Sequence, residues 1–488
     1  MKGVKKDSLT VNFIMNIILT MSSFIFPLIT FPYISRVLLA EGNGKVQFAT
    51  SVVSYFILLA QLGIPTYGVR ACAAVRDDRR KLSKTVHELF VINAVMTVVS
   101  YAAFFAVLFS VPRLHNERML YIITSGGILL NLFGMEWLFR AVEQYRYITI
   151  RSLAFKVISV AAMFLLVHQQ SDYLIYAAIS VVASLGSNVL NLTQLHKHID
   201  CRYMGDYHFK QHLRPILIFF AMSCTITIYT SLDSAMLGFM ATDADVGYYA
   251  AGVKIKNILV SITAALGTVI LPRAAYYFEN KRLEEFWRIV TKALRFVMLV
   301  SIPLTVYFML FAENGVYLLS GESYTNAIMP MVAIMPTLVC VGLTSVLGNQ
   351  ILVPSGREKM VMYSTMVGAA GDVVANALLI PTLQALGAAI GTLLAEMAVL
   401  CFQFVVVRKE VAGILRQLHI PFMVLATGLA AAGSFWVKWL PFGDFLALAV
   451  SAAIFFAVYL LLLIIKKEPL LLEIMDKLLA KLKRGRKV

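Results

Sequence analysis

The first long apolar stretch of the chain is VNFIMNIILTMSSFIFPLITFPYISRVLL, residues 11–39, and it follows Lys2, Lys5 and Lys6. An α-helix needs about 20 apolar residues to cross a bilayer, whereas the apolar part of a signal peptide has only roughly 7–15. The stretch is therefore predicted to be a retained membrane-spanning helix. Stretches of similar character recur along the whole chain.

The composition excludes a soluble protein. Hydrophobic residues make up 59% of the 488 residues, charged residues make up 14%, and the mean hydropathy is +0.78. Soluble domains are roughly 45–50% apolar and about 25% charged. A soluble enzyme, a disordered protein and a coiled coil are therefore excluded. The five cysteines are scattered without a CxxC pair, and His208 and His212 lie on a short connector, so no metal site is predicted.

We predict an all-α polytopic membrane protein with about fourteen membrane-spanning helices. The expected spans are residues 12–38, 45–66, 86–111, 119–140, 150–168, 173–194, 214–238, 246–271, 292–312, 326–350, 360–381, 385–407, 418–440 and 444–465. With the N-terminus in the cytoplasm, 36 of the 43 Lys and Arg fall on cytoplasmic segments, five fall outside and two lie within the eighth span. Cytoplasmic loops carry the excess of cations, so both termini are predicted to be cytoplasmic.

Two weak similarities predict an internal repeat. Gly44 precedes Arg70 by 26 residues, and Gly247 precedes Arg273 by 26 residues, an offset of 203. The sequence Ala-Ala-Ile occurs at 177–179 and at 388–390, an offset of 211. Six spans per copy predicts two lobes related by an axis along the membrane normal, with a site where the lobes meet. The predicted parts are residues 1–200 (N-terminal lobe), 201–410 (C-terminal lobe) and 411–488 (helices 13 and 14 with a basic cytoplasmic tail).

The first span carries a polar stripe. Its members are spaced three or four residues apart, which keeps them on one helix face: Asn12, Asn16, Thr20, Ser23, Pro27 and Thr30. The stripe is either a packed helix–helix seam or the wall of a substrate cavity. Asn16 is a candidate substrate-binding residue under the second interpretation.

Cations within the membrane are further candidates for substrate binding. Lys254 is predicted to lie roughly 10 Å inside the eighth span, at 1.5 Å per residue, where a cation costs about 2.5–3.5 kcal/mol. It either faces a water-filled cavity that holds an anionic substrate, or it reaches the headgroups or pairs with Asp233. Asn257 lies on the same face, whereas Lys256 lies on the other, and Arg36 ends the first span at the outer edge.

Carboxylates in the eleventh and twelfth spans are candidates for ion coupling. Asp372 belongs to a stripe with Ser364, Gly368 and Asn376, and Glu396 to another with Thr392 and Gln403. Both acids are predicted near the membrane midplane, which suits a proton or cation relay, with Asp233 as a third candidate. The alternative is a pair of structural carboxylates. The positions 211 residues earlier are Ala161 and Leu185, so the two lobes are not chemically equivalent.

Sequence signatures of other functions are absent from the chain. It contains no GxxxxGK[ST], HExxH or GxSxG motif, which speaks against ATP-driven transport by this chain and against an enzyme. No nucleic-acid partner and no cofactor other than a coupling proton or sodium ion are expected.

Several segments resemble the bacterial polysaccharide-unit flippases of the Wzx type, in the multidrug/oligosaccharidyl-lipid/polysaccharide (MOP) exporter superfamily. They are FPYISRVL (31–38), QLGIPTYGVR (61–70), VGYYA (246–250), LPR (271–273) and GNQILVPSGREK (348–359). The lipid II flippases are also similar, and they carry a cation in the corresponding helix at a position that matches Lys254 or its neighbour. They carry another in the second helix, where this chain has Ser51.

The resemblance implies a flippase in the bacterial inner membrane. Its expected cargo is an oligosaccharide repeat unit on undecaprenyl diphosphate, moved to the outer leaflet by alternating access for capsule, exopolysaccharide or O-antigen assembly. Cations would bind the diphosphate. Membrane lipids, a polysaccharide polymerase and glycosyltransferases are the expected partners of a monomer. A lipid II flippase and a cation-coupled multidrug exporter are the alternatives.

Overall fold

The computed structural model describes residues 9–473, with side chains described at 11–23, 25–263, 270–414 and 417–473. Lys2, Lys5, Lys6 and the basic tail lie outside this part. Within the described residues every regular element is a helix. The chain contacts divide it into two units, Met1–Gly247 and Tyr248–Val488, and each is described by itself.

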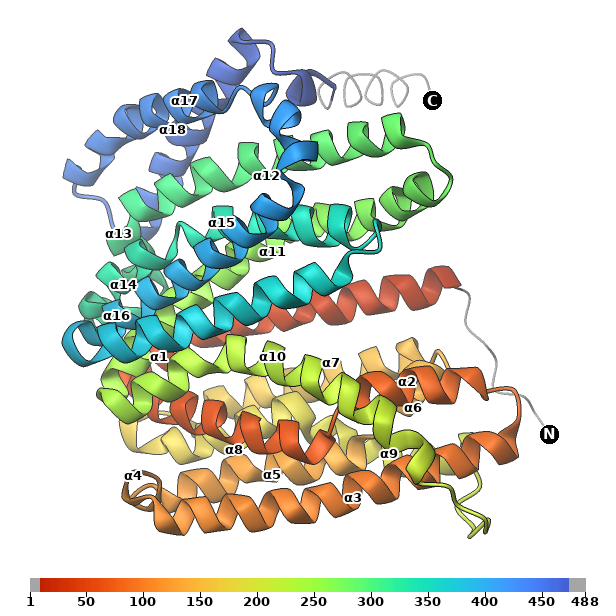
Figure 1. Ribbon diagram of the computed structural model, residues 1–488. Helices are drawn as coiled ribbons and strands as arrows, with labels where there is room; N and C mark the ends of the chain where they lie inside the picture. Colours follow the sequence, from red (N-terminus) through yellow and green to blue (C-terminus); the bar gives the residue numbers. More distant parts are fainter. Residues whose placement is uncertain (1–8, 474–488) are drawn as a thin grey trace, which may run out of the picture. The chain divides into compact units, whose positions relative to one another are not determined.

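Unit 1 consists of helices that mostly run parallel or antiparallel to one another (Figure 1). They are α1 (Leu9–Gln61), α2 (Ile64–Ala74), α3 (Arg79–Ser110), α4 (Pro112–His115), α5 (Arg118–Gly134), α6 (Glu136–Ala141), α7 (Tyr145–Leu166), η1 (Gln170–Asp172), α8 (Tyr173–Leu185), η2 (Gly186–Val189), α9 (Leu190–His198) and α10 (Lys210–Met240).

Unit 2 begins within α11 and continues to the end of the chain. Its helices are α11 (Asp243–Glu279), α12 (Leu283–Leu310), α13 (Ala312–Ser320), η3 (Glu322–Ala327), α14 (Ile328–Ile334), α15 (Thr337–Ser345), η4 (Val346–Leu352), α16 (Glu358–Arg416), α17 (Ile420–Phe435), η5 (Trp436–Trp439) and α18 (Asp444–Ile465).

The two longest helices are each a pair of helices joined by a sharp break. Leu39 interrupts α1 with φ 56°, and Gln384 interrupts α16 with φ 50°. A non-glycine residue at positive φ is uncommon, and here it lets the chain reverse direction within one or two residues. The predicted span 12–38 lies in the first half of α1, and the span 45–66 covers most of its second half and then crosses a break into α2. The predicted spans 360–381 and 385–407 lie in the two halves of α16.

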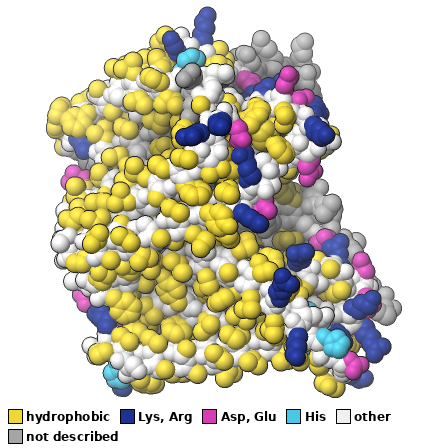
Figure 2. All heavy atoms as spheres, in the orientation of Figure 1, with side chains coloured by type: hydrophobic (Ala, Val, Ile, Leu, Met, Phe, Trp, Pro, Cys, Tyr) yellow, Lys and Arg dark blue, Asp and Glu magenta, His cyan; other side chains and the backbone are white. Residues whose placement is uncertain are grey.

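The prediction of an all-α polytopic membrane protein is confirmed. In the part of the chain that the structure describes, nine helices are long and apolar enough to cross a membrane, or ten if one bent pair is a single span. Their outer faces carry large apolar side chains, such as Val98 (69% exposed) and Leu378 (70% exposed), and Figure 2 shows such side chains over most of the visible face. The number of fourteen crossings and the cytoplasmic termini stay predictions.

The start of α3 is fixed by a capping carboxylate. Asp78 accepts a hydrogen bond from the backbone N–H of Lys81 at 3.1 Å, which satisfies a donor that the first helical turn leaves without a partner. The same bond lowers the pKa of Asp78 below its ordinary value. The neighbouring Arg76 pairs with Glu143 at 2.6 Å, so this basic connector is tied to the connector after α6.

Gly44 and Gly247 permit a close backbone approach inside unit 1. A Cβ atom at Gly44 would overlap the carbonyl oxygen of Asp243, and one at Gly247 would overlap the carbonyl oxygen of Ala40. Ala40 and Asp243 are 203 residues apart, as are Gly44 and Gly247. The segment 40–44 therefore contacts the segment 243–247 through the same two positions in each segment. Two copies related by a two-fold axis produce this pattern of contacts.

Candidate functional site

A lysine lies about midway along α7, a helix that is long and apolar enough to cross a membrane. Lys156 Nζ donates to the hydroxyl oxygens of Ser22 at 2.8 Å and Ser23 at 3.2 Å, and it lies 5.7 Å from the centre of the Phe26 ring. Among the described residues these contacts involve no carboxylate, so the charge is solvated by hydroxyls but not neutralised. In the count of cations, Lys156 belongs to the predicted cytoplasmic segment from Arg140 to Lys156, and this assignment stays a prediction.

The polar stripe of the first span contributes one of the two hydroxyls that meet Lys156, that of Ser23, while Ser22 lies beside the stripe. Asn12 at one end of the stripe is buried, whereas Asn16, Thr20 and Ser23 are exposed. Apolar residues of the same stretch, such as Phe13 and Met21, are exposed as well, so the seam and the cavity wall both stay open as interpretations of the stripe.

The other two candidates in unit 1 have different surroundings. Arg36 is exposed and donates to the carbonyl oxygen of Pro32 at 2.7 Å, one turn earlier in its own helix. Asp233 is 6% exposed within α10. Neither residue contributes to the Lys156 contacts described above.

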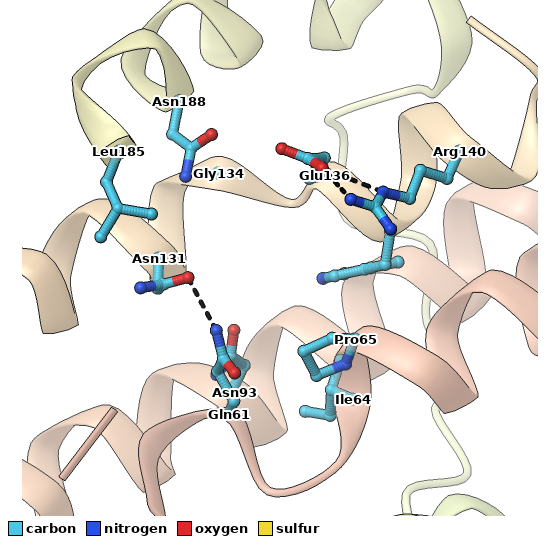
Figure 3. Close-up of a pocket in the computed structure, with 11 residues that line it drawn as sticks. Gln61, Ile64, Pro65, Asn93, Asn131, Gly134, Glu136, Arg140, Leu185 and Asn188 are labelled. Atoms are coloured by element: carbon cyan, nitrogen blue, oxygen red, sulfur yellow. Dashed lines mark hydrogen bonds and ion pairs between the residues drawn. The ribbon is translucent and has the colours of Figure 1, made fainter. Parts of the chain in front are cut away.

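Unit 1 also contains a polar cavity of about 270 Å³ (Figure 3). It lies among α1, α2, α3, α5, α6, α8 and η2. Its lining combines amides, an ion pair and apolar groups: Gln61, Ile64, Pro65, Asn93, Asn131, Gly134, Glu136, Trp137, Arg140, Leu185 and Asn188. Figure 3 shows these side chains around a common space.

Hydrogen bonds hold the amides of the cavity in place. Gln61 donates from Nε2 to Asn131 Oδ1 at 2.7 Å, and Asn131 donates from Nδ2 to the Gly127 carbonyl at 2.9 Å. Asn93 donates from Nδ2 to the Ala60 carbonyl at 2.7 Å. The amide orientations are therefore set before any ligand arrives.

The carboxylate of Glu136 and the guanidinium group of Arg140 line another part of the cavity, and Arg151 contacts Glu136 from outside the lining. Glu136 accepts from Arg140 at 2.9 and 2.6 Å through Oε1 and from Arg151 at 3.1 Å through Oε2. The Arg151 side chain is only 2% exposed, and it also donates to Ser187 and Asn188 at 2.9 Å each. This network lies at the break between α5 and α6. Met135 has φ 37° at the break, and Glu136 is the next residue.

Gly134 keeps space at this break for Asn188. A Cβ at Gly134 would lie 2.6 Å from Asn188 Nδ2. Sequence reasoning missed this cavity, although each of its four amides lies in or next to a predicted span. Polar side chains within membrane helices cost free energy, so they are rare there. A search of the predicted spans for Asn and Gln would therefore have found the four amides.

In unit 2 the predicted cations lie on α11. Lys254 and Lys256 are half-buried and Asn257 is exposed. Their roles as substrate-binding residues stay predictions.

The predicted carboxylates of unit 2 are buried. Asp372 is 2% exposed and Glu396 is 6% exposed, on the two halves of α16. The polar faces of these halves meet, because Gln403 donates to the Ser364 hydroxyl at 3.0 Å and Gly391 leaves room for the amide of Asn376.

Helix α11 joins the same region of unit 2. The Tyr249 hydroxyl is 2.9 Å from the Thr392 hydroxyl, with both groups buried. The four-residue spacing in the sequence therefore identified a real polar interior, while its role in ion coupling stays a prediction.

Comparisons with known proteins agree with this architecture. Residues 9–278 match the family model "Polysaccharide biosynthesis protein", and residues 219–378 match the MatE model. A relative from Escherichia coli (strain K12), named "Putative O-antigen transporter", is 24% identical over 414 residues, which cover 84% of this chain and 99% of the relative. A relative of the same name from Shigella dysenteriae is 20% identical over 395 residues, which cover 79% and 97%.

Solved structures show the same fold. The lipid II flippase MurJ in an inward closed conformation has a TM-score of 0.73 at 13% identity, covering 93% of this chain and 99% of that one. An outward-facing multidrug resistance MATE family transporter of the MOP superfamily has a TM-score of 0.53 at 12% identity, covering 84% and 95%. Since the first family model spans more than half of the sequence, the chain belongs to the polysaccharide biosynthesis protein family and is a Wzx-type flippase of the MOP superfamily in the bacterial inner membrane.

Proposed function

We propose that this flippase moves undecaprenyl-diphosphate-linked oligosaccharide repeat units from the cytoplasmic to the outer leaflet, by alternating access through a cationic cavity. The units would serve capsule, exopolysaccharide or O-antigen assembly. The proteins named as O-antigen transporters are distant relatives of nearly the same extent, and they support this class of cargo. The cargo crosses the membrane chemically unchanged, so no catalytic residue is proposed.

Lys156 is the observation that carries the proposal. A cation halfway along a membrane helix, held by two hydroxyls, offers an anionic headgroup a partner that is already partly desolvated. The exposed polar residues of α1 continue from it along one helix face. On α11, the half-buried Lys254 is the corresponding candidate of unit 2, with Lys256, Asn257 and Arg36 as further candidates.

We further propose that transport is coupled to a proton or sodium ion through Asp372 and Glu396, with Asp233 as an additional candidate. Buried carboxylates in membrane helices commonly mark ion pathways. Here the two acids lie on helix halves that also carry hydroxyl and amide groups at three- or four-residue spacing, and such oxygens suit a bound cation. Imposing a sodium gradient and a proton gradient separately on vesicles containing the protein would identify the coupling ion.

A chromosomal deletion tests the cargo. In a host without a second flippase of this type, deletion is expected to abolish surface polymer and to leave the undecaprenyl-linked unit inaccessible to a membrane-impermeant probe. The wild-type gene should restore both. Normal polymer would contradict the proposal. Lysis on depletion would point to lipid II instead, and altered sensitivity to cationic dyes with normal polymer would point to a drug exporter.

A further inference from the structure

We propose that the polar cavity of unit 1 is a binding subsite for one neutral sugar ring of the cargo. The inference deepens the proposed function and rests on it, because a free saccharide matters to this protein only as part of a lipid-linked unit. It is carried by the cavity itself and by the chemistry of its lining.

The size of the cavity suits a single small polar molecule. Pockets for drug-sized ligands have volumes of about 300–1,000 Å³, and this cavity of about 270 Å³ lies just below that range. It is too small for the lipid or for a whole oligosaccharide. Its side near Arg140 is open, since half of that side chain is exposed, so a ring could enter while the rest of a chain stays outside.

The amides of the cavity match sugar hydroxyls. A hydroxyl both donates and accepts, and a carboxamide does the same. Among the hydrogen bonds of the described residues, Gln61 and Asn93 use their amide N–H groups, while their oxygens Oε1 and Oδ1 remain available as acceptors. These two acceptors come from α1 and α3, so two hydroxyls could be bound from one side of a ring.

The charged side of the cavity favours a neutral ligand over an anion. Arg140 and Arg151 already bind the two carboxylate oxygens of Glu136, so a phosphate would have to displace that carboxylate. A hydroxyl displaces nothing, because each carboxylate oxygen can accept another hydrogen bond. The ion pair can therefore contribute an acceptor to a sugar while remaining intact.

Trp137 supplies the apolar surface that the C–H face of a sugar needs. Its indole lines the cavity and is 6% exposed overall. The indole ring packs directly on the backbone of Gly68, because a Cβ atom at Gly68 would lie only 2.8 Å from the ring. This contact fixes the position of the ring. The amides, the carboxylate and the indole together form a site for a polyhydroxylated ring.

Trp137 also provides the measurement. The chain has four tryptophans, and replacing Trp287, Trp436 and Trp439 by Phe leaves Trp137 as the only tryptophan, which is excited selectively at wavelengths that the tyrosines do not absorb. The purified full-length protein in lipid nanodiscs would be titrated with free glucose, galactose, mannose, rhamnose and N-acetylglucosamine, with glycerol at equal osmolality as the solvent control. We expect a saturable change in emission with at least one sugar, with half-saturation at roughly 1–20 mM.

Variants of the amides decide whether the signal comes from the cavity. Asn131→Leu is expected to raise the half-saturating concentration at least about tenfold. Asn280→Leu, which removes an exposed amide on a turn of unit 2, should leave it unchanged. Asn93→Ala gives the same test if the Leu variant does not fold. A linear response to every sugar, or a saturable one that both amide variants retain, would overturn the subsite. The proposed function fails separately, through normal polymer in the deletion strain.

Discussion

The polar interiors of the two units differ in charge and in space. Unit 1 combines neutral amides with two guanidinium groups around one carboxylate, and it keeps an open cavity. Unit 2 buries two carboxylates, Asp372 and Glu396, in a region where the halves of α16 meet. The difference matches the separate roles proposed above, polar cargo in unit 1 and a small cation in unit 2.

The predicted internal repeat makes this comparison specific. An offset of 211 residues pairs Glu396 with Leu185 and Asp372 with Ala161. Leu185 lines the cavity of unit 1, so an apolar wall stands where the other copy has an acid. In both units a glycine admits an asparagine amide, Gly134 with Asn188 and Gly391 with Asn376. The close packing is thus common to the two interiors, while the charges differ.

The largest expected effect comes from removing the acids of unit 2. The double variant Asp372→Asn and Glu396→Gln should lower surface polymer by about 5- to 150-fold, the range of a typical coupling between two ligands. Wild-type protein levels should be retained. The control pair Asp206→Asn and Glu322→Gln changes two exposed acids and should have no effect. Full polymer in the acid-free variant would remove the assignment of ion coupling to unit 2.

The next effect concerns the stability of unit 1. Arg151→Met removes hydrogen bonds to Ser187, Asn188 and Glu136 from a side chain that is 2% exposed. We expect the free energy of unfolding to fall by about 2–3 kcal/mol, measured by denaturant titration of the purified protein. An unchanged unfolding midpoint would mean that the hydrogen bonds of Arg151 do not stabilise the break between α5 and α6.

A smaller effect is expected from the lysine of α7. Lys156→Met should reduce polymer about tenfold, equivalent to about 1.4 kcal/mol in the transport barrier, because the anionic headgroup loses one partner. Lys156→Arg should retain most of the activity. Lys210→Met, at an exposed lysine at the start of α10, is the matched control. Equal output from Lys156→Met and its control would exclude Lys156 from cargo binding.

The smallest effect is expected at the open side of the cavity. Arg140→Met breaks an ion pair with Glu136 in which half of the arginine side chain is exposed. Such pairs contribute at most about 1 kcal/mol, so the same denaturant titration should show a loss well below that of Arg151→Met. A loss as large as that of Arg151→Met would show that Glu136 depends on both arginines equally.

The sequence was sufficient for the helices and for the polar interior of unit 2. Apolar length locates a membrane helix, and the four-residue spacing from Ser364 to Asn376 places polar groups on one face. Counting cations along the chain did not show that Arg151 and Lys156 lie within a helix, because such a count does not distinguish a loop from the first turns of a helix.

The cavity could not be predicted for a different reason. Gln61, Asn93, Asn131 and Asn188 lie in or beside four separate predicted spans, and no spacing along the chain relates them. They converge only through tertiary packing and through the breaks after Gln61 and Gly134. The periodicity of polar residues describes one helix at a time, so it does not predict a site that several helices share.

The reciprocal approach of Gly44 and Gly247 also bears on how this chain can evolve. The atoms that a new Cβ would strike at either position are main-chain atoms, at Asp243 and Ala40. No change of a neighbouring side chain can make room for the Cβ atom. A substitution at Asp243 or Ala40 would leave the main-chain carbonyl in place. A second-site suppressor is therefore not available to either glycine, and a library of variants that selects for surface polymer should return glycine alone at both positions.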